Sequence, residues 1–522
     1  MLLLAYLIGG CGGPTGGTTK DLAPTTDLGP TIGSLAEVFT VESMPVEGYG
    51  LVGGLNGTGS VECPPEIRAY LTRYIMTRLP EYKGGIGKLI GRRDTAVVRL
   101  EGAVPAGAWK GQSFDVKVTV VPGTQTTSLE DGWLYTAELK AKGTFGKTTR
   151  VIGRAEGPIF IDKMGTSRTN KKLGYVLAGG KVLDEYNVGL ELRKSDYQIA
   201  SRIRNRLNER FGYGAATAVS PRRINLTVPA EHREQKQRFV SIVKATYLDE
   251  TPEITRERIK TFVRRLAVSK DKYANEIALE SIGKESLGKL PILLNSSDEQ
   301  VRLRAARCTL NLGSDMGLQT LRQIALDKGS PYRIEALETI TGAARRDDAA
   351  AIARKLLRDD DFGIRLAAYR QLRALGDIAV TQRLVARSFS LEEVGQNERK
   401  AIYVSRSGQA QIVLFGAPIL CREDIFVQSA DGNITINAPP GQKYILVMRK
   451  HPTQPATIGP LKSSFKLSDI IQALCDEPVR VEKQWRGGLG VSYADVIALL
   501  KQMCDKGAVR AEFRAGPLPK IG

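Results

Sequence analysis

The chain has 522 residues, of which 42% are hydrophobic and 25% charged, and its formal net charge is +19. This length allows three or four domains of about 150 residues each, and the composition is ordinary for a globular protein. After the N-terminus, no segment reaches the roughly 18 consecutive apolar residues of a membrane helix, so none is predicted there. The charge favours a polyanionic neighbour, but the basic residues are spread along the chain, and general solubility explains them equally well.

The N-terminus has the pattern of an export signal. Leu2 to Ile8 is an apolar run too short to span a bilayer, and Gly9-Gly10-Cys11 follows it. Small residues before a cleavage point are typical of signal peptides. The order also resembles a bacterial lipobox, which makes Cys11 a candidate lipid anchor; an ordinary signal peptide is the alternative. We therefore predict a signal peptide at 1–11 and a flexible tether, rich in Gly, Thr and Pro, at 12–33.

The cysteines and histidines give no metal site. The six cysteines form no CxxC pair, and the two histidines, His232 and His451, are isolated from each other in the sequence. We therefore predict no metal and no cofactor. With Cys11 lipidated, five cysteines remain, and they are either buried free thiols or the partners of one or two disulfides.

Residues 34–250 have the signals of a mixed α/β region. Runs of alternating or β-branched residues predict strands at 97–100, 114–121 and 224–228. Apolar residues at helical spacing predict helices at 65–79 and 195–211.

Residues 252–390 change character and contain an internal repeat. Val301 to Ala305, Tyr332 to Ala336 and Ile364 to Ala368 align, with steps of 31 and 32 residues between their arginines. Acidic turns such as Ser297-Asp298 and Asp359-Asp360-Asp361 can cap the helices that follow them. A single helical hairpin cannot bury its apolar face, so the units must stack. The segment resembles HEAT-like helical repeats, and it is either a protein-binding surface or a spacer.

Residues 398–516 return to α/β. Their patterns predict strands at 401–404, 411–414, 433–437, 444–448 and 509–513, and helices at 466–475 and 493–506.

The run from Gly48 to Gly59 contains a literal GxGxxG. A dinucleotide loop must open a helix, so that the free N–H groups at its start meet the pyrophosphate. Here more glycines follow, and each would destabilise a helix by about 1 kcal/mol. We therefore reject a nucleotide site.

The same run resembles the opening signature of the bacterial flagellar P-ring protein family. Its signature candidates are Gly48, Tyr49, Gly50, Gly53, Gly54, Asn56, Gly57 and Gly59. Further matches follow in the family's order: 96–116, Ser128-Leu129 with Gly132-Trp133-Leu134, and 212–229, which opens with the candidates Gly212, Tyr213 and Gly214. Near the C-terminus, Val404 to Gly408 and 491–512 resemble the family's closing segments.

The resemblance implies a non-enzymatic structural subunit. Such proteins form a periplasmic ring around the flagellar rod in the peptidoglycan layer and act as a bushing for motility. The implied partners are copies of itself, rod and outer-membrane ring proteins and peptidoglycan, with a membrane through Cys11 and no nucleic acid. The alternative is a lipid-anchored envelope scaffold that binds another protein through its helical repeats.

The sequence departs from the family pattern in its helical segment and its cysteines. The repeat has no counterpart in the family, so we predict an α+β multidomain fold in which P-ring-type α/β regions are interrupted by an inserted all-α, HEAT-like solenoid. Some members carry a cysteine near the C-terminus, at the position that is Ala508 here. Cys504 lies one helical turn earlier, and a disulfide between Cys421 and Cys504 is one interpretation.

Overall fold

The computed structural model describes residues 28–39, 43–78, 85–144, 149–165, 169–184, 188–395, 398–451, 456–481 and 484–521. The predicted signal peptide, Cys11 and most of the predicted tether lie outside the described residues. Within the described ranges, no helix combines the length and hydropathy needed to cross a membrane.

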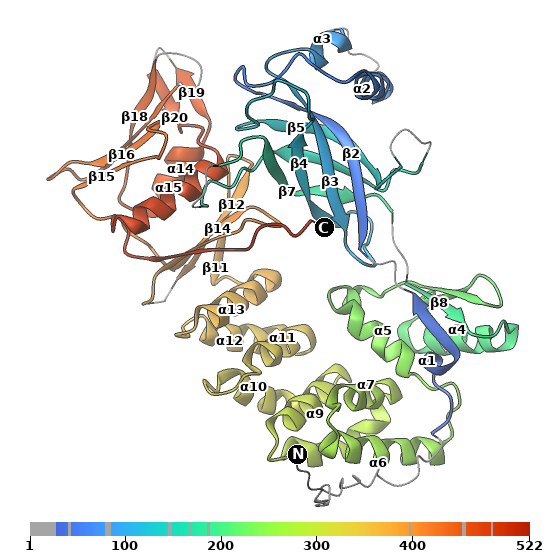
Figure 1. The fold of residues 1–522 in the computed structure, drawn as a ribbon. Helices are drawn as coiled ribbons and strands as arrows, with labels where there is room; N and C mark the ends of the chain where they lie inside the picture. The colour runs from blue at the N-terminus through green and yellow to red at the C-terminus, as the bar shows by residue number, and fades with distance from the viewer. Residues whose placement is uncertain are drawn as a thin grey trace, which may run out of the picture.

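A closed barrel forms the first large unit (Figure 1). Alternation along β4 turns Phe114, Val116, Val118 and Val120 toward the interior, as the sequence pattern predicts. Two helices, α2 (Pro65–Arg78) and α3 (Ile86–Ile90), pack against the outside of β2 and β3. In order around the barrel, the strands are β2 (Met44–Gly53), β3 (Ala96–Val104), β4 (Ser113–Val120), β7 (Leu173–Val182), β6 (Gly153–Pro158) and β5 (Trp133–Ala141).

A small α/β unit holds the two ends of the barrel segment. Its sheet has the order β1-β8-β10-β9, and the whole barrel is inserted between β1 and β8. Apolar residues of α4 and α5, including Ile203, Leu207 and Phe239, cover the sheet and form its core. The elements are α1 (Ile32–Leu35), β1 (Ala36–Phe39), β8 (Val188–Leu192), α4 (Tyr197–Phe211), β9 (Ala216–Ala218), β10 (Arg223–Leu226) and α5 (Lys236–Ala245).

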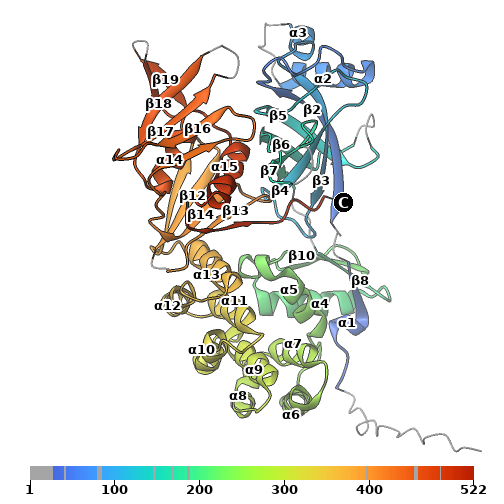
Figure 2. The ribbon, with the colours of Figure 1, turned by 60° about the vertical axis from the view of Figure 1, so that its left-hand side comes forward.

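An array of helices leads from this unit to the C-terminal part (Figure 2). Asp298 and Asp361 cap α9 and α13 by accepting hydrogen bonds from backbone N–H groups, as predicted. The helices are α6 (Pro252–Val268), α7 (Lys272–Ile282), α8 (Pro291–Leu294), α9 (Glu299–Asn311), α10 (Leu318–Leu326), α11 (Arg333–Ala343), α12 (Arg346–Leu356) and α13 (Phe362–Leu375).

The repeated arginines have one shared role. Arg302 donates to the carbonyls of Ser296 and Ser297, and Arg333 and Arg365 likewise donate to carbonyls N-terminal to their own helices. Each arginine therefore ties its helix to the preceding segment, which explains why the residue recurs with the repeat. The recurring helices fit the predicted stacking, and their description as HEAT-like stays a prediction.

The helical array ends earlier than the predicted boundary at 390. Gly376 adopts a left-handed conformation (φ 60°) and closes α13, and strands follow from Val380. These two strands, β11 (Val380–Val385) and β12 (Phe389–Gly395), join the C-terminal sheet, whose order is β11-β12-β14-β13-β21.

The C-terminal part combines this sheet with a four-stranded sheet, in the order β15-β16-β17-β18, and a two-stranded sheet, β19-β20. Helices α14 and α15 pack on one face of the first sheet, and α13 packs on the other. The last strand lies at 512–515 rather than at the predicted 509–513. The remaining elements are β13 (Ala401–Val404), β14 (Gln411–Ala417), β15 (Ile425–Gln428), β16 (Ile434–Ala438), β17 (Ile445–Lys450), β18 (Thr457–Ser463), α14 (Leu467–Cys475), β19 (Pro478–Val481), β20 (Gln484–Gly487), α15 (Tyr493–Asp505) and β21 (Glu512–Ala515). The α+β class predicted from the sequence is confirmed.

Candidate functional site

The first glycines of the run lie inside β2, where they allow close packing against β5. A Cβ on Gly48 would lie 2.3 Å from the carbonyl oxygen of Glu138, and one on Gly50 would lie 2.9 Å from Cδ1 of Leu134. Between them, Tyr49 packs toward α2 on the other side of the strand. These glycines therefore let β2 meet β5 and close the barrel. Because they belong to a strand and not to the start of a helix, the rejection of a nucleotide loop fits the structure.

The later glycines turn the chain out of β2. Gly54 and Gly57 have φ values of 77° and 76°, which side chains rarely tolerate. Gly59 donates its N–H to the carbonyl of Arg93, and a Cβ there would lie 2.0 Å from the carbonyl oxygen of Thr95. Gly53 ends β2, and Asn56 is exposed at the turn. The run is thus a strand followed by a tight turn.

The second candidate group, Gly212, Tyr213 and Gly214, lies elsewhere, between α4 and β9. Gly212 and Gly214 have positive φ values of 96° and 86°, and open space surrounds both. Tyr213 is fully exposed. The structure does not bring this group together with the first glycine run.

The turn after β2 reaches a cleft between the barrel and the C-terminal part. The hydroxyl of Thr58 donates to the carbonyl of Ser128 at 2.8 Å, which joins the glycine run to the Ser128–Leu134 motif. The cleft has a volume of about 720 Å³. Its lining includes Asn56, Thr58, Ser128, Glu130, Asp131, Lys163, Asp431, Arg449 and Asp495.

Ion pairs cross this cleft. Nζ of Lys163 lies 2.9 Å from Glu130 of the barrel and 2.5 Å from Asp495 of α15. Arg449 of β17 faces Asp131 at 3.5 Å. Lys163 therefore bridges two segments that are far apart in the sequence.

A second set of contacts joins the same two parts. Asp115 of β4 accepts hydrogen bonds from the hydroxyl of Ser407 at 2.8 Å and from the N–H of Gly408. Arg406 pairs with Asp162 at 3.1 Å. We call the contacts of Asp115, Asp162 and Lys163 with Arg406, Ser407, Gly408 and Asp495 the barrel clasp. Its members include residues of the sequence motifs on both sides of the helical array.

Burial and neighbouring charges shift the pKa values of the ionisable groups in this cleft. Burial alone would raise the pKa of Glu130, but hydrogen bonds from Lys171 and Lys163 outweigh it and lower the pKa. Loss of hydration and the nearby carboxylate of Asp495 raise the pKa of Asp131. The two carboxylates beside Lys163 outweigh its own desolvation and raise its pKa. Glu130, Asp131, Lys163, Arg449 and Asp495 are therefore held in ion pairs within the cleft. The described residues contain no group of three or more His, Cys, Asp or Glu side chains placed for a metal.

Replacing Lys163 by methionine tests the clasp. The side chain is mostly buried (22% exposed), and its loss leaves Glu130 and Asp495 without their shared cation. We expect the free energy of unfolding, measured by urea denaturation, to fall by about 1–3 kcal/mol. Lys172→Met is the matched control, because Lys172 is exposed on the barrel surface. Equal stability of the two variants would contradict the clasp.

Comparison with known proteins bears on this part of the chain. Residues 31–259 match the family model described as flagellar P-ring protein. This part of the chain is similar to flagellar P-ring proteins. It contains the small α/β unit, the complete barrel and the start of α6.

Individual flagellar P-ring proteins give the same result. The chain is 32% identical to the flagellar P-ring protein of Albidiferax ferrireducens, and the alignment covers 38% of this chain and 55% of the relative. The identity is 31% for Nitrosomonas europaea, over 41% and 59% of the two chains, and 27% for an Escherichia coli protein, over 44% and 65%. The chain thus spans somewhat over half the length of these curated relatives.

The P-ring match covers one side of the barrel clasp. Asp115, Asp162 and Lys163 lie within it, whereas Arg406 to Gly408 and Asp495 lie beyond residue 259. The likeness of residues 398–516 to the family therefore stays a prediction. Nothing in the sequence singled out Lys163, because its partner Asp495 is 332 residues away.

The cysteines that were candidates for a disulfide are close to each other. Both Cys421 and Cys504 are free thiols in the structure. Burial, with a contribution from Cys504, raises the pKa of Cys421 to about 12, and burial raises the pKa of Cys504 to about 11. Both thiols are therefore protonated at neutral pH and react slowly. The disulfide stays a prediction.

Proposed function

We propose that this chain is a structural, non-enzymatic subunit of the flagellar basal-body P ring. In this role, copies of the chain close into a periplasmic ring around the rod, within the peptidoglycan layer and beside the outer-membrane ring, and the ring serves motility as a bushing. The observation that carries the proposal is the family match over residues 31–259, which includes the whole barrel. Cys11 would add a lipid anchor.

The fold offers physical support for a ring subunit. A rotational ring needs a head-to-tail interface that closes, and a subunit whose parts keep their relative positions holds such an interface in register. The barrel clasp fixes the C-terminal part against the barrel, and the helices connect the same C-terminal part to the small α/β unit. Both the barrel clasp and the helical array therefore hold the C-terminal part in place relative to the rest of the subunit.

A second candidate function is a lipid-anchored envelope scaffold that binds another protein through its helical repeats. It is favoured by the position of the helical array α6–α13. Apart from the beginning of α6, this array lies outside the family match. In this case the P-ring fold would be retained without a place in the basal body.

Removing the gene from the source bacterium distinguishes the two functions. We expect swimming to be lost and basal bodies, isolated and imaged by electron microscopy, to lack the ring around the rod. A plasmid copy of the full chain should restore both the ring and swimming. Basal bodies with a complete ring in the deletion strain would contradict the P-ring role and favour the scaffold.

A further inference from the structure

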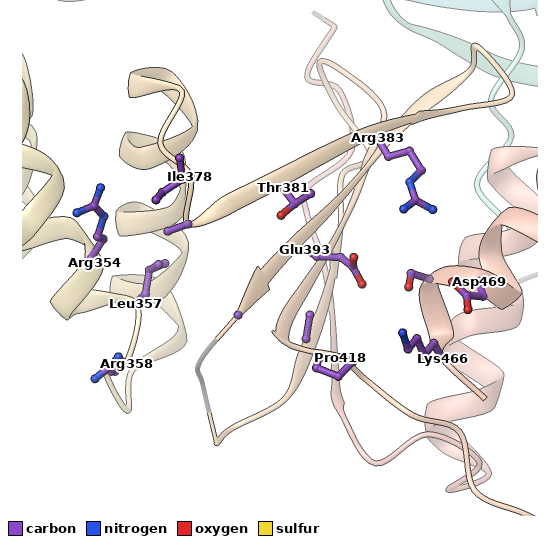
Figure 3. Close-up of a pocket in the computed structure, with 14 residues that line it drawn as sticks. Arg354, Leu357, Arg358, Ile378, Thr381, Arg383, Glu393, Pro418, Lys466 and Asp469 are labelled. Carbon is purple, nitrogen blue, oxygen red and sulfur yellow. The ribbon is translucent and has the colours of Figure 1, made fainter. Parts of the chain in front are cut away.

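A groove lies at the outer edge of the C-terminal sheet, away from the barrel clasp. Its volume is about 780 Å³. Strands β11 and β12 form its floor, and Figure 3 shows Lys466 and Asp469 of the α14 region on one side and Arg354 and Arg358 on the other. The groove lies outside residues 31–259, so an inference about it goes beyond the proposed ring role.

The groove has an excess of positive charge. It is lined by four cationic side chains, Arg354, Arg358, Arg383 and Lys466, and by two carboxylates, Glu393 and Asp469. Arg354 is paired with Asp377 at 2.6 Å. Arg383 donates to the neutral amide oxygen of Gln472 at 2.7 Å, and this bond leaves its charge uncancelled. The groove therefore attracts an anionic partner.

The floor of the groove ends in an open strand edge. β11 pairs with β12 and forms one edge of the sheet in the described part of the chain. Its four central residues, from Thr381 to Leu384, are all exposed. The backbone groups on the outer side of such a strand can pair with another extended segment.

Apolar side chains stand at both ends of β11. Ile378, just before the strand, is 91% exposed, and Leu384 is 66% exposed. Large apolar side chains beside an open edge are a liability unless a partner covers them. A single arginine on an edge strand can also serve only to prevent unwanted pairing. Here, however, Lys466 and Arg358 extend the charge onto other elements, well beyond the strand itself.

We propose that β11 and its groove bind an acidic, extended polypeptide segment of another protein by strand addition. The segment pairs its backbone with the free edge of β11, sets apolar side chains on Ile378 and Leu384, and turns carboxylates toward Arg383 and Lys466. A second copy of this chain is the less suitable occupant, because its net charge of +19 opposes docking on a basic surface.

Peptide binding to the full chain tests this proposal. The probe is a synthetic peptide of about ten residues, enough to span β11, that alternates glutamate with valine or threonine; its counterpart carries lysine in place of glutamate. We expect the acidic peptide to bind at least about tenfold more tightly in fluorescence anisotropy at low salt. Hydrogen exchange should show added protection of the amides at 380–385 in the complex.

The variant Arg383→Glu combined with Lys466→Glu should weaken acidic-peptide binding by at least about tenfold. Arg387→Glu is the matched control on the same hairpin, since Arg387 is exposed and does not line the groove. All three positions are exposed, and thermal unfolding of each variant checks that the fold is kept. The proposal is overturned if both peptides bind equally, if the double variant binds like the unmodified chain, or if binding leaves the amides of β11 unprotected. Self-association in sedimentation that the double variant abolishes would overturn it too, because the occupant would then be a second copy.

Discussion

Replacing Glu276 by glutamine is expected to lower the free energy of unfolding by about 3–5 kcal/mol, because it leaves buried guanidinium groups without their counter-charge. Glu276 in α7 is completely buried and faces three arginines. The distances are 2.6 Å to Arg238, 2.5 Å to Arg307 and 3.3 Å to Arg304. Chemical denaturation followed by circular dichroism, which reports helix content, measures the change.

The matched control is Glu253→Gln in α6. Glu253 is 74% exposed and forms a pair with Arg256 one turn along the same helix. Exposed pairs of this kind contribute little, so we expect a change within about 0.5 kcal/mol. If both variants unfold at the same denaturant concentration, the buried cluster does not hold the helices together.

The pH dependence of the Glu276 effect follows from its environment. Burial alone would raise its pKa, but the charges and hydrogen bonds of Arg238, Arg307 and Arg304 outweigh burial and lower it. A carboxylate with a lowered folded-state pKa stabilises the fold fully above its unfolded-state pKa, and this stabilisation is lost as the pH falls through the folded-state value. The stability difference between the unmodified chain and Glu276→Gln should therefore be largest near neutral pH and shrink in acid.

The cluster around Glu276 also explains the repeat in physical terms. Arg307 contacts Glu276 and Arg304 contacts Glu335, and both contacts join residues 31 apart, which is the first repeat step. The sign of the charge alternates from Arg238 in α5 to Glu276 in α7, to the arginines of α9 and to Glu335 in α11. Helices α5, α7, α9 and α11 therefore supply one another's counter-charges, and two of these contacts have the spacing of the first repeat step.

Local patterns could be predicted from the sequence because neighbouring residues decide them. The alternation at 114–121 gives β4, and the acidic caps before α9 and α13 lie where the sequence placed them. The barrel could not be predicted, because its closure depends on the pairing of β2 with β5. The paired residues Val52 of β2 and Leu134 of β5 are far apart in the chain.

The same reasoning applies to the candidate site. The sequence identified the glycine run, the Ser128 turn and the segment that contains Asp495 as separate motifs. It did not show that they meet, because Lys163, which connects Glu130 to Asp495, belongs to none of them. The end of the helical array was misplaced for a related reason: β12 pairs with β14, and β11 joins the sheet only through β12, so no local signal marks the sheet that residues 380–395 enter.

Replacing Gly48 by valine is expected to prevent normal closure of the barrel. Any Cβ at this position would lie 2.3 Å from the carbonyl oxygen of Glu138, a backbone atom of β5 that cannot move aside without displacing the strand. We expect a loss in the free energy of unfolding of about 3 kcal/mol or more, at the upper end of overpacking costs. Thermal unfolding of the purified chain measures it, and the proposed ring role predicts that a plasmid carrying the variant fails to restore swimming.

Two other glycines separate the effect of space from that of backbone conformation. Gly87→Ala lies in α3 with open space around it, and it should be neutral or stabilise by up to about 1 kcal/mol. Gly57→Ala is also unobstructed but has a φ of 76°, so it should cost about 1–2 kcal/mol. If Gly48→Val is as stable as Gly87→Ala, contact between β2 and β5 does not require a glycine. If instead only Gly48→Val unfolds, the first glycines of the run are needed to close the barrel.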